Sequence, residues 1–255
     1  MPIAISRLLT SAISRCELTH LARAPIDVER AQREHAEYER ALVQAGCTLV
    51  RIGSDDTMPD AVFIEDTAVV LDEIAVITRP GAASRRAEID GVAVVLASYR
   101  TLAAIESPGT LDGGDVLRIG KRILVGLSPR SNDDGVAQLR AIVAGFGYTV
   151  EGVPFTGCLH LKSAATLVAP SLALVNPAWV DAAALGDVGT IAVDPLEPHA
   201  ANALLIGDVV IYPAECAATA RRLEEAGIRL LLVPAGELAK AEGGVTCCSL
   251  ILDAG

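Results

Sequence analysis

This sequence has few aromatic side chains, no long apolar runs and no excess of basic residues. Aromatic residues make up only 3% of the 255 residues. Unbroken apolar runs such as 92–97 and 230–233 are far too short to span a membrane. Arg7 and Arg15 interrupt the apolar N-terminal stretch, which argues against a signal peptide. We therefore expect a soluble cytoplasmic protein that does not bind membranes.

The charge balance argues against a nucleic-acid partner. The 21 Lys and Arg residues are outnumbered by 32 Asp and Glu residues, so the net charge is −11. Proteins that bind duplexes normally carry a basic surface, which this chain lacks. A small cationic substrate would suit the acidic balance, although acidity also serves solubility alone.

Cysteine is sparse, and no Cys-x-x-Cys motif occurs among the six cysteines. We therefore expect neither a disulfide scaffold nor a structural zinc site. Hydrophobic residues make up 51% of a chain that is long enough for a packed core. No stretch resembles a linker, so we expect one domain over residues 1–255.

Helices alternate with short hairpins along the chain. Apolar residues spaced three and four apart predict helices at 28–45, 133–144 and 213–226, with shorter helices at 84–89 and 178–185. Pairs of short strands around turn dipeptides predict hairpins at 68–78, 116–126, 165–175 and 204–212.

A polar residue opens each unit, and these residues recur at intervals of 42 to 48 residues. They are Glu65, Asp112, His160, Asn202 and Cys247. A period of about 45 residues predicts an array or a propeller. The fifth unit is split between residues 243–252 and 1–52, so the two chain ends would close a circular α/β fold without exposed sheet edges. The opening residues would then converge on one central channel.

Two adjacent cysteines, Cys247 and Cys248, follow a pair of glycines near the C-terminus. Cysteines usually pack as small hydrophobic residues, and an adjacent pair can also form a disulfide. Neighbouring side chains of a strand point to opposite faces. We therefore expect one cysteine to face the channel and the other to pack.

His160 stands between two leucines, a pattern that predicts a strand with His160 and Lys162 on the same side. A lone histidine among leucines is usually a hydrogen-bonded core residue. The position of His160 at the opening of a repeat makes it a catalytic candidate as well.

Carboxylates gather in two segments, one with Asp60, Glu65 and Asp66 and the other with Asp112 and Asp115. Acidic residues in turns often cap backbone amides. Around a thiol they raise its pKa and make it inert, whereas a bound cation would reverse that effect.

Arg85 and Arg130 each follow the second hairpin strand of their repeat. A planar guanidinium can bind a carboxylate through two hydrogen bonds. Both arginines are therefore candidates for binding the α-carboxylate of an amino-acid substrate, and surface solubility is the alternative explanation.

Six segments carry a resemblance to a known family. They are Phe63-Ile64-Glu65-Asp66, Arg79-Pro80-Gly81 with Ser84-Arg85-Arg86, Leu111-Asp112-Gly113-Gly114-Asp115-Val116, Leu127-Ser128 with Arg130-Ser131-Asn132, Cys158-Leu159-His160-Leu161-Lys162-Ser163, and Thr246-Cys247-Cys248-Ser249. In this order they resemble the dimethylarginine dimethylaminohydrolases of the guanidine-modifying superfamily, which also includes arginine deiminase and the amidinotransferases. The resemblance implies a five-bladed pseudo-symmetric α/β propeller of ββαβ repeats, closed by the N- and C-terminal segments.

The resemblance also implies roles for individual residues. Cys247 would be the nucleophile, His160 the general acid and base, and Asp112 the partner of His160, where many bacterial relatives carry Glu. Substrate would be bound by Leu18 in a lid loop and Asp60 at the α-amino group, Glu65 and Asp66 at the guanidinium, and Arg85 and Arg130 at the carboxylate.

The implied reaction is hydrolysis of N-omega-methylated arginines to citrulline and dimethylamine or methylamine, without a cofactor or a metal. The substrate would be a small cation. Members of the family form dimers or monomers, so a homodimer is an open prediction.

Four other interpretations compete with this one. An arginine deiminase shares the mechanism, but deiminases usually carry an extra helical domain. A non-catalytic binding protein for arginine analogues would not need Cys247. A redox protein would use Cys247 and Cys248 as a switch, and a zinc enzyme would bind metal at the Cys–His–acid cluster.

Overall fold

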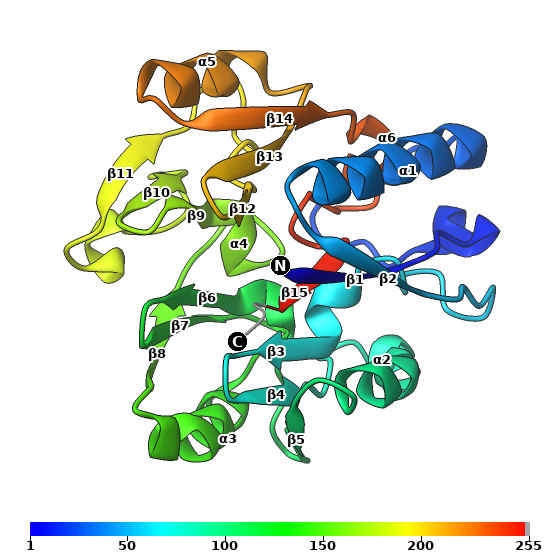
Figure 1. Ribbon diagram of the computed structural model, residues 1–255, viewed down its shortest axis with the longest axis vertical. Coiled ribbons are helices and arrows are strands. Elements are labelled where there is room, and N and C mark those ends of the chain that lie inside the picture. Colours follow the sequence, from blue (N-terminus) through cyan, green and yellow to red (C-terminus); the bar gives the residue numbers. More distant parts are fainter. Residues whose placement is uncertain (253–255) are drawn as a thin grey trace.

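In a computed structural model, residues 1–252 of the protein are described. Within them the strands form five sheets of three strands each. The sheets follow one another around a common centre in chain order (Figure 1). This arrangement confirms the expected α/β propeller of five ββαβ units.

Each sheet joins an antiparallel pair to a third strand that runs parallel to the middle strand. Four sheets come from continuous segments. Their strands are β3 (Ala68–Val70), β4 (Ile74–Ile77) and β5 (Thr101–Ala104); β6 (Val116–Ile119), β7 (Arg122–Leu127) and β8 (Thr149–Pro154); β9 (Ala165–Ala169), β10 (Leu172–Val175) and β11 (Gly189–Ala192); β12 (Leu204–Ile206), β13 (Val209–Pro213) and β14 (Arg229–Val233).

The fifth sheet joins the two ends of the chain. Its middle strand is β1 (Ile3–Arg7), which lies antiparallel to β15 (Ser249–Leu252) and parallel to β2 (Thr48–Ile52). The split fifth unit is therefore confirmed. Strand β15 has a partner only because the end of the chain returns to β1.

Helices lie at the periphery of the ring, outside the sheets (Figure 1). The α-helices are α1 (Val28–Gln44), α2 (Ile89–Leu96), α3 (Asp133–Val143), α4 (Leu161–Ala164), α5 (Ala217–Glu225) and α6 (Gly236–Ala239), and the short 3-10 helices are Ser11–Arg15, Ile64–Thr67, Ala83–Glu88, Gly113–Asp115, Ala144–Phe146 and Ala182–Leu185. Three of them are exceptions that lie toward the centre, where they contact one another or β15: α4 and the 3-10 helices Ile64–Thr67 and Gly113–Asp115 (Figure 1). No helix within residues 1–252 is both long and apolar enough to cross a membrane.

Helix α1 illustrates how local sequence determines an element. The carboxylate of Asp27 accepts the backbone N–H of Arg30, which caps the helix start. Tyr38 and Leu42 lie on the buried stripe. Beyond the helix, Gly46 has a φ of 96°, a conformation that glycine adopts without strain.

Several predicted boundaries are wrong. The helix predicted at 213–226 begins at Ala217, because Pro213 pairs with Val233 as the last residue of β13. The segment predicted at 84–89 is a 3-10 helix that continues into α2, where Val92 and Leu96 are buried and Val94 is exposed. Of the helix predicted at 178–185, only Ala182–Leu185 is helical, as a 3-10 turn.

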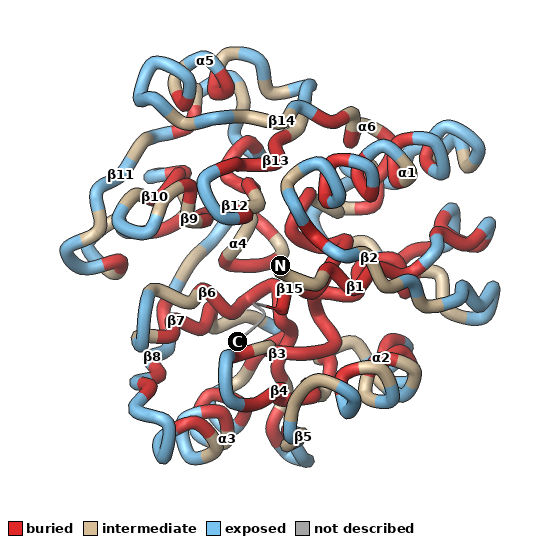
Figure 2. Tube along the Cα trace, in the orientation of Figure 1, coloured by how far each residue is buried: buried red, intermediate tan, exposed pale blue. Residues whose placement is uncertain are grey.

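Buried apolar residues form five clusters, and each lies between neighbouring blades. One cluster packs Ile5 and Leu250 of the closing sheet against Ile77 of β4 and Leu96 of α2. Buried segments concentrate toward the centre, whereas the outer helices expose one side (Figure 2). The core is therefore shared between blades, so no blade buries its apolar face alone.

We expect Ile5→Ala to destabilise the protein by about 2–5 kcal/mol, since this fully buried side chain fills the contact that closes the ring. Urea unfolding measures the effect. The control is Val43→Ala on the outer face of α1, where 54% of the residue is exposed and the change should stay within about 0.5 kcal/mol. Equal effects of the two substitutions would contradict the role of β1 in closure.

Candidate active site

The polar residues that open the repeats meet at the centre of the ring. The backbone N–H of Glu65 donates to the carbonyl oxygen of Cys247 at 3.1 Å. The imidazole Nε2 of His160 lies 3.1 Å from Oδ2 of Asp112. Each of these residues stands shortly before the first strand of a sheet, which explains why a repeat in the sequence becomes a cluster in space.

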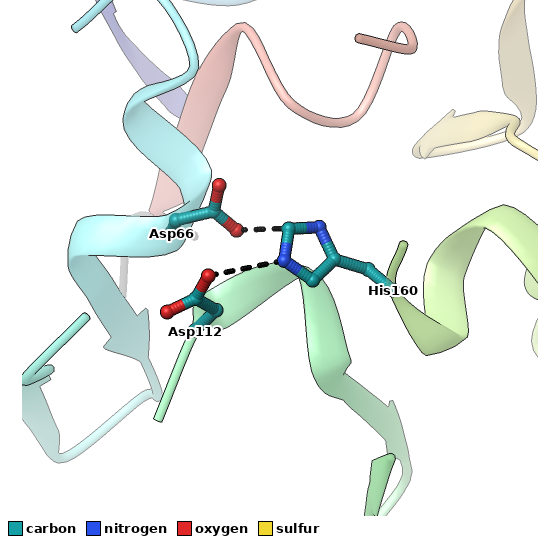
Figure 3. A group of neighbouring side chains, drawn as sticks. All are labelled: Asp66, Asp112 and His160. Carbon is teal, nitrogen blue, oxygen red and sulfur yellow. Dashed lines mark hydrogen bonds and ion pairs between the residues drawn. The ribbon is translucent and has the colours of Figure 1, made fainter. Parts of the chain in front are cut away.

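The imidazole of His160 faces two carboxylates, Asp66 and Asp112, which come from two other blades (Figure 3). In addition to the contact with Asp112, its Nδ1 lies 3.8 Å from Oδ1 of Asp66. Asp112 therefore reaches the imidazole although its side chain is one carbon shorter than Glu. All three residues are buried.

These carboxylates keep the imidazole charged. Burial alone would lower the pKa of His160, but the carboxylates of Asp66 and Asp112 outweigh it and raise the pKa to about 9. Burial likewise disfavours the carboxylate of Asp66, yet His160 and Arg85 lower its pKa to about 2. At neutral pH the pair is an imidazolium beside a carboxylate.

Asp115 positions both members of the His160–Asp112 pair. Its Oδ2 accepts a hydrogen bond from the Ser131 hydroxyl at 2.7 Å, and that hydroxyl oxygen accepts the backbone N–H of Asp112 at 3.0 Å. Its Oδ1 accepts the backbone N–H of Leu161, the residue after His160, at 3.0 Å. Asp115 thus caps backbone amides, one of the roles expected for acids in turns.

The strand predicted around His160 is wrong. His160 precedes the one-turn helix α4, and the N–H of Ser163 donates to the His160 carbonyl oxygen. The imidazole packs on Gly114, where a Cβ atom would lie 2.6 Å from Nδ1. Only glycine leaves room for the ring at this position.

Cys247 lies in a turn before β15, not within the predicted strand. The backbone N–H of Gly244 donates to its Sγ at 3.3 Å. Cys247 faces the same cavity as His160, whereas Cys248 packs in the core near Tyr38. One cysteine faces the cavity and one packs, as expected, and both are free thiols.

The Cys247 thiol is held in its neutral form. Burial is the largest cause, and the charges of Glu65 and Asp66 add to it, so the pKa rises to about 12. The predicted effect of the surrounding acids on the thiol therefore has the right sign, but desolvation contributes more than the acids do.

The cavity between Cys247 and His160 is small and polar, with a volume of about 20 Å³. The predicted site residues that line it are Cys247, His160, Asp60, Asp66, Arg85 and Arg130. Three others lie outside the lining: Asp112 is behind His160, Leu18 packs against the neighbouring core cluster, and Glu65 faces a second cavity.

Glu65 belongs to a network on the far side of Cys247. Its carboxylate accepts hydrogen bonds from Lys162 Nζ at 2.6 Å and from the Thr246 hydroxyl at 2.7 Å. Asn202 accepts the backbone N–H of Thr246 and donates to the Thr246 hydroxyl. The sequence pattern singles out Lys162 but does not predict its pairing with Glu65, which lies 97 residues away in the chain.

Arg85 is buried and pairs with two carboxylates of the protein. Its guanidinium donates to Asp66 at 2.5 Å and to Glu88 at 2.8 Å. Arg130 lies 3.6 Å from Asp112 and donates to the Thr19 hydroxyl at 3.3 Å. A carboxylate-binding role for the two arginines stays a prediction.

Asp66, Asp112 and His160 could in principle hold a metal ion, since their donor atoms all lie within 4.8 Å of one another. A cation there would have to compete with Arg85 at Asp66 and with Arg130 near Asp112. The arrangement suits proton transfer at an imidazolium better than metal binding.

Comparisons with known proteins agree with this site. No protein-family model matches the chain. Among solved structures, the N-terminal domain of ArgZ, an arginine dihydrolase from cyanobacteria, has the same fold with a TM-score of 0.88, 19% identity and coverage of 99% of this chain and 97% of that one. This likeness shows that the two chains share a fold, in which Cys247, His160 and Asp112 of this chain are buried.

Two relatives specify the family. The N(G),N(G)-dimethylarginine dimethylaminohydrolase of Streptomyces coelicolor is 39% identical over 236 residues, 92% of this chain and 91% of the relative. The enzyme of that name from Pseudomonas aeruginosa is 31% identical over 234 residues, 91% of each chain. A cysteine-to-serine variant of the Pseudomonas enzyme, complexed with citrulline, superimposes with a TM-score of 0.94 at 29% identity over 98% of both chains. The chain belongs to the dimethylarginine dimethylaminohydrolase family.

We expect the imidazole of His160 to titrate near pH 9 and Asp112→Asn to lower its pKa by about 1 to 3 units, because a neutral amide stabilises the imidazolium less. NMR titration of the ring measures both values. An imidazole pKa that the substitution leaves unchanged would contradict the role of Asp112.

The same shift makes stability depend on pH. The pKa of His160 rises from 6.5 to about 9 on folding, so its stabilising contribution is complete below pH 6.5 and is lost as the pH rises through 9. The wild type should lose more unfolding free energy than Asp112→Asn over this interval.

Proposed function

We propose that the protein hydrolyses N-omega-methylated arginines, asymmetric dimethylarginine and monomethylarginine, to citrulline and dimethylamine or methylamine. The observation that carries the proposal is the cavity shared by the Cys247 thiol and the His160 imidazolium, with Asp112 behind His160. The names of the relatives and the citrulline complex of the Pseudomonas enzyme support the substrate class.

The cavity has suitable partners for each end of such a substrate. Asp66 is suited to a guanidinium, since it already accepts one guanidinium N–H from Arg85, and Glu65 supports it with a second negative charge. In our proposal Arg85 and Arg130 bind the α-carboxylate, while Asp60 and the loop at Leu18 bind the α-amino group.

The guanidinium itself generates the nucleophile. Its positive charge offsets the carboxylates of Glu65 and Asp66, which lowers the pKa of Cys247, and the thiol releases its proton to solvent. The thiolate attacks the guanidinium carbon and forms a C–S bond. The His160 imidazolium then protonates the methylated nitrogen, the C–N bond breaks, and the amine leaves an S-alkylthiouronium on Cys247.

Water completes the reaction. His160, now neutral, takes a proton from a water molecule whose oxygen attacks the same carbon. The hydroxyl group of the resulting tetrahedral intermediate loses its proton to solvent and becomes the citrulline carbonyl as the C–S bond breaks and Cys247 leaves as thiolate. Citrulline is released with His160 protonated again, and the thiolate then regains a proton from solvent. The overall reaction consumes one water molecule for each amine released, and its steps require no oxidant, metal or organic cofactor.

We expect purified protein to convert asymmetric dimethylarginine to citrulline and dimethylamine faster than it converts arginine to citrulline and ammonia. Amine quantification with the two substrates side by side measures the preference. Cys247→Ser should still bind the substrate but lose at least about a thousandfold in turnover. Faster turnover of arginine would make the protein a deiminase, and unchanged turnover of Cys247→Ser would exclude the covalent mechanism.

We also expect a cationic reagent to activate its own target thiol. Chloroacetamidine should alkylate Cys247 at neutral pH at least about ten times faster than chloroacetamide, which has the same shape without the charge. Mass spectrometry of the digested protein identifies the modified cysteine. Equal rates, or modification of Cys248 in place of Cys247, would contradict activation by charge.

A further inference from the structure

The loop over the active site is held by two carboxylates. We call residues 17–21 the lid segment. The backbone N–H of Glu17 donates to both oxygens of Asp60, at 3.1 and 3.2 Å. The backbone N–H groups of residues 19–21 all donate to the carboxylate of Glu242.

One oxygen of Glu242 makes most of these contacts. Its Oε1 accepts the N–H of Thr19 at 3.1 Å, of His20 at 2.5 Å and of Leu21 at 2.6 Å. Its Oε2 accepts the N–H of Thr19 again, at 3.0 Å. Hydrogen bonds to a charged acceptor are stronger than neutral ones. Glu242 is therefore the main anchor of an otherwise exposed segment.

The backbone of Glu242 adopts a conformation that normally belongs to glycine. After α6, the N–H of Gly243 donates to the carbonyl oxygen of Leu238, and the N–H of Glu242 donates to that of Ala239. This pair of bonds is the Schellman ending of a helix, whose left-handed residue is usually glycine. Glu242 has a φ of 59° and is the one non-glycine residue with positive φ in the described chain, 1–252.

Glycine would relieve this strain, yet the position carries a long acidic side chain. The residue next to it, Gly243, has no room for a side chain, because a Cβ atom would lie 2.2 Å from the Phe63 ring. Gly244 follows and donates its N–H to Cys247 Sγ. The loop therefore directs the carboxylate of Glu242 toward the lid segment and the backbone N–H of Gly244 toward the Cys247 thiol.

We propose that Glu242 is a positioning residue that keeps the lid segment closed over bound substrate. The cavity beneath the closed lid has a volume of about 20 Å³, which is room for about one water molecule and not for an arginine derivative. Substrate must therefore enter while the lid is open. Glu242 then favours the closed state, in which Leu18 and Asp60 are in place for the α-amino end. The catalytic consequence rests on the proposed function, but the closed lid does not.

Three substitutions at Glu242 separate the effect of side-chain length from the effect of the strained left-handed backbone. Glu242→Gly removes the side chain and the strain together. Glu242→Asn tolerates the left-handed backbone but is one carbon too short to reach the lid. Glu242→Gln keeps the length of the side chain and one carbonyl oxygen. One oxygen is enough to hold the lid segment, because Oε1 alone accepts the N–H groups of Thr19, His20 and Leu21. Glu225→Gln, at an exposed carboxylate on α5, is the control for loss of one charge.

Hydrogen exchange measures the lid without any substrate. We expect the amides of Thr19, His20 and Leu21 to exchange at least about ten times faster in Glu242→Gly and Glu242→Asn than in the wild type. Glu242→Gln should remain closer to the wild type, and Glu225→Gln should equal it. The melting temperature of Glu242→Gly should be unchanged or higher, because the strain is gone.

Kinetics then measures the effect of the lid on substrate. KM for dimethylarginine should rise at least about tenfold in Glu242→Gly and Glu242→Asn, with kcat changed by less than about threefold. Unchanged exchange in Glu242→Gly, or identical behaviour of the Gln and Asn variants, would overturn the proposal. If exchange responds as expected while the wild type does not hydrolyse dimethylarginine, the proposed function fails and the lid contact stands.

Discussion

Burial of four carboxylates at the centre of the ring is the constraint on which the rest of the structure depends. An unpaired buried charge is strongly destabilising, so each carboxylate needs donors. The pairs are Glu65 with Lys162 and the Thr246 hydroxyl, Asp66 with Arg85 and the Gly114 N–H, Asp112 with His160 and the Gly81 N–H, and Asp115 with Ser128, Ser131 and the Leu161 N–H. Most donors come from another blade, so the charges are satisfied only when the blades are assembled.

The same charges determine the resting state of the site. Asp66 and Asp112 keep His160 as an imidazolium, while burial together with Glu65 and Asp66 keeps Cys247 as a thiol. A proton donor for the leaving amine is therefore ready before substrate binds, whereas the nucleophile is not. A cationic guanidine would complete the arrangement, because it supplies the charge that favours the thiolate. Stability and the proposed chemistry thus depend on one cluster.

Elements governed by local pattern could be predicted from the sequence. Helix α1 is predicted at 28–45 and spans Val28–Gln44, and the hairpin predicted at 116–126 is formed by β6 and β7. A contact between blades caused the error at His160. Alternating Leu and polar residues around His160 predicted a strand, but Asp115 from another blade caps the backbone there and a helical turn forms.

The sequence by itself determined the number of blades, their circular closure and the residue types that open each blade. These features are periodic or local along the chain, so they can be detected without coordinates. Only the folded structure shows which thiol faces the imidazole, that Arg85 pairs with Asp66, and that Glu242 accepts the backbone N–H of His20, 222 residues before it. Such partners are determined by proximity in space, which the linear order of the residues does not reveal.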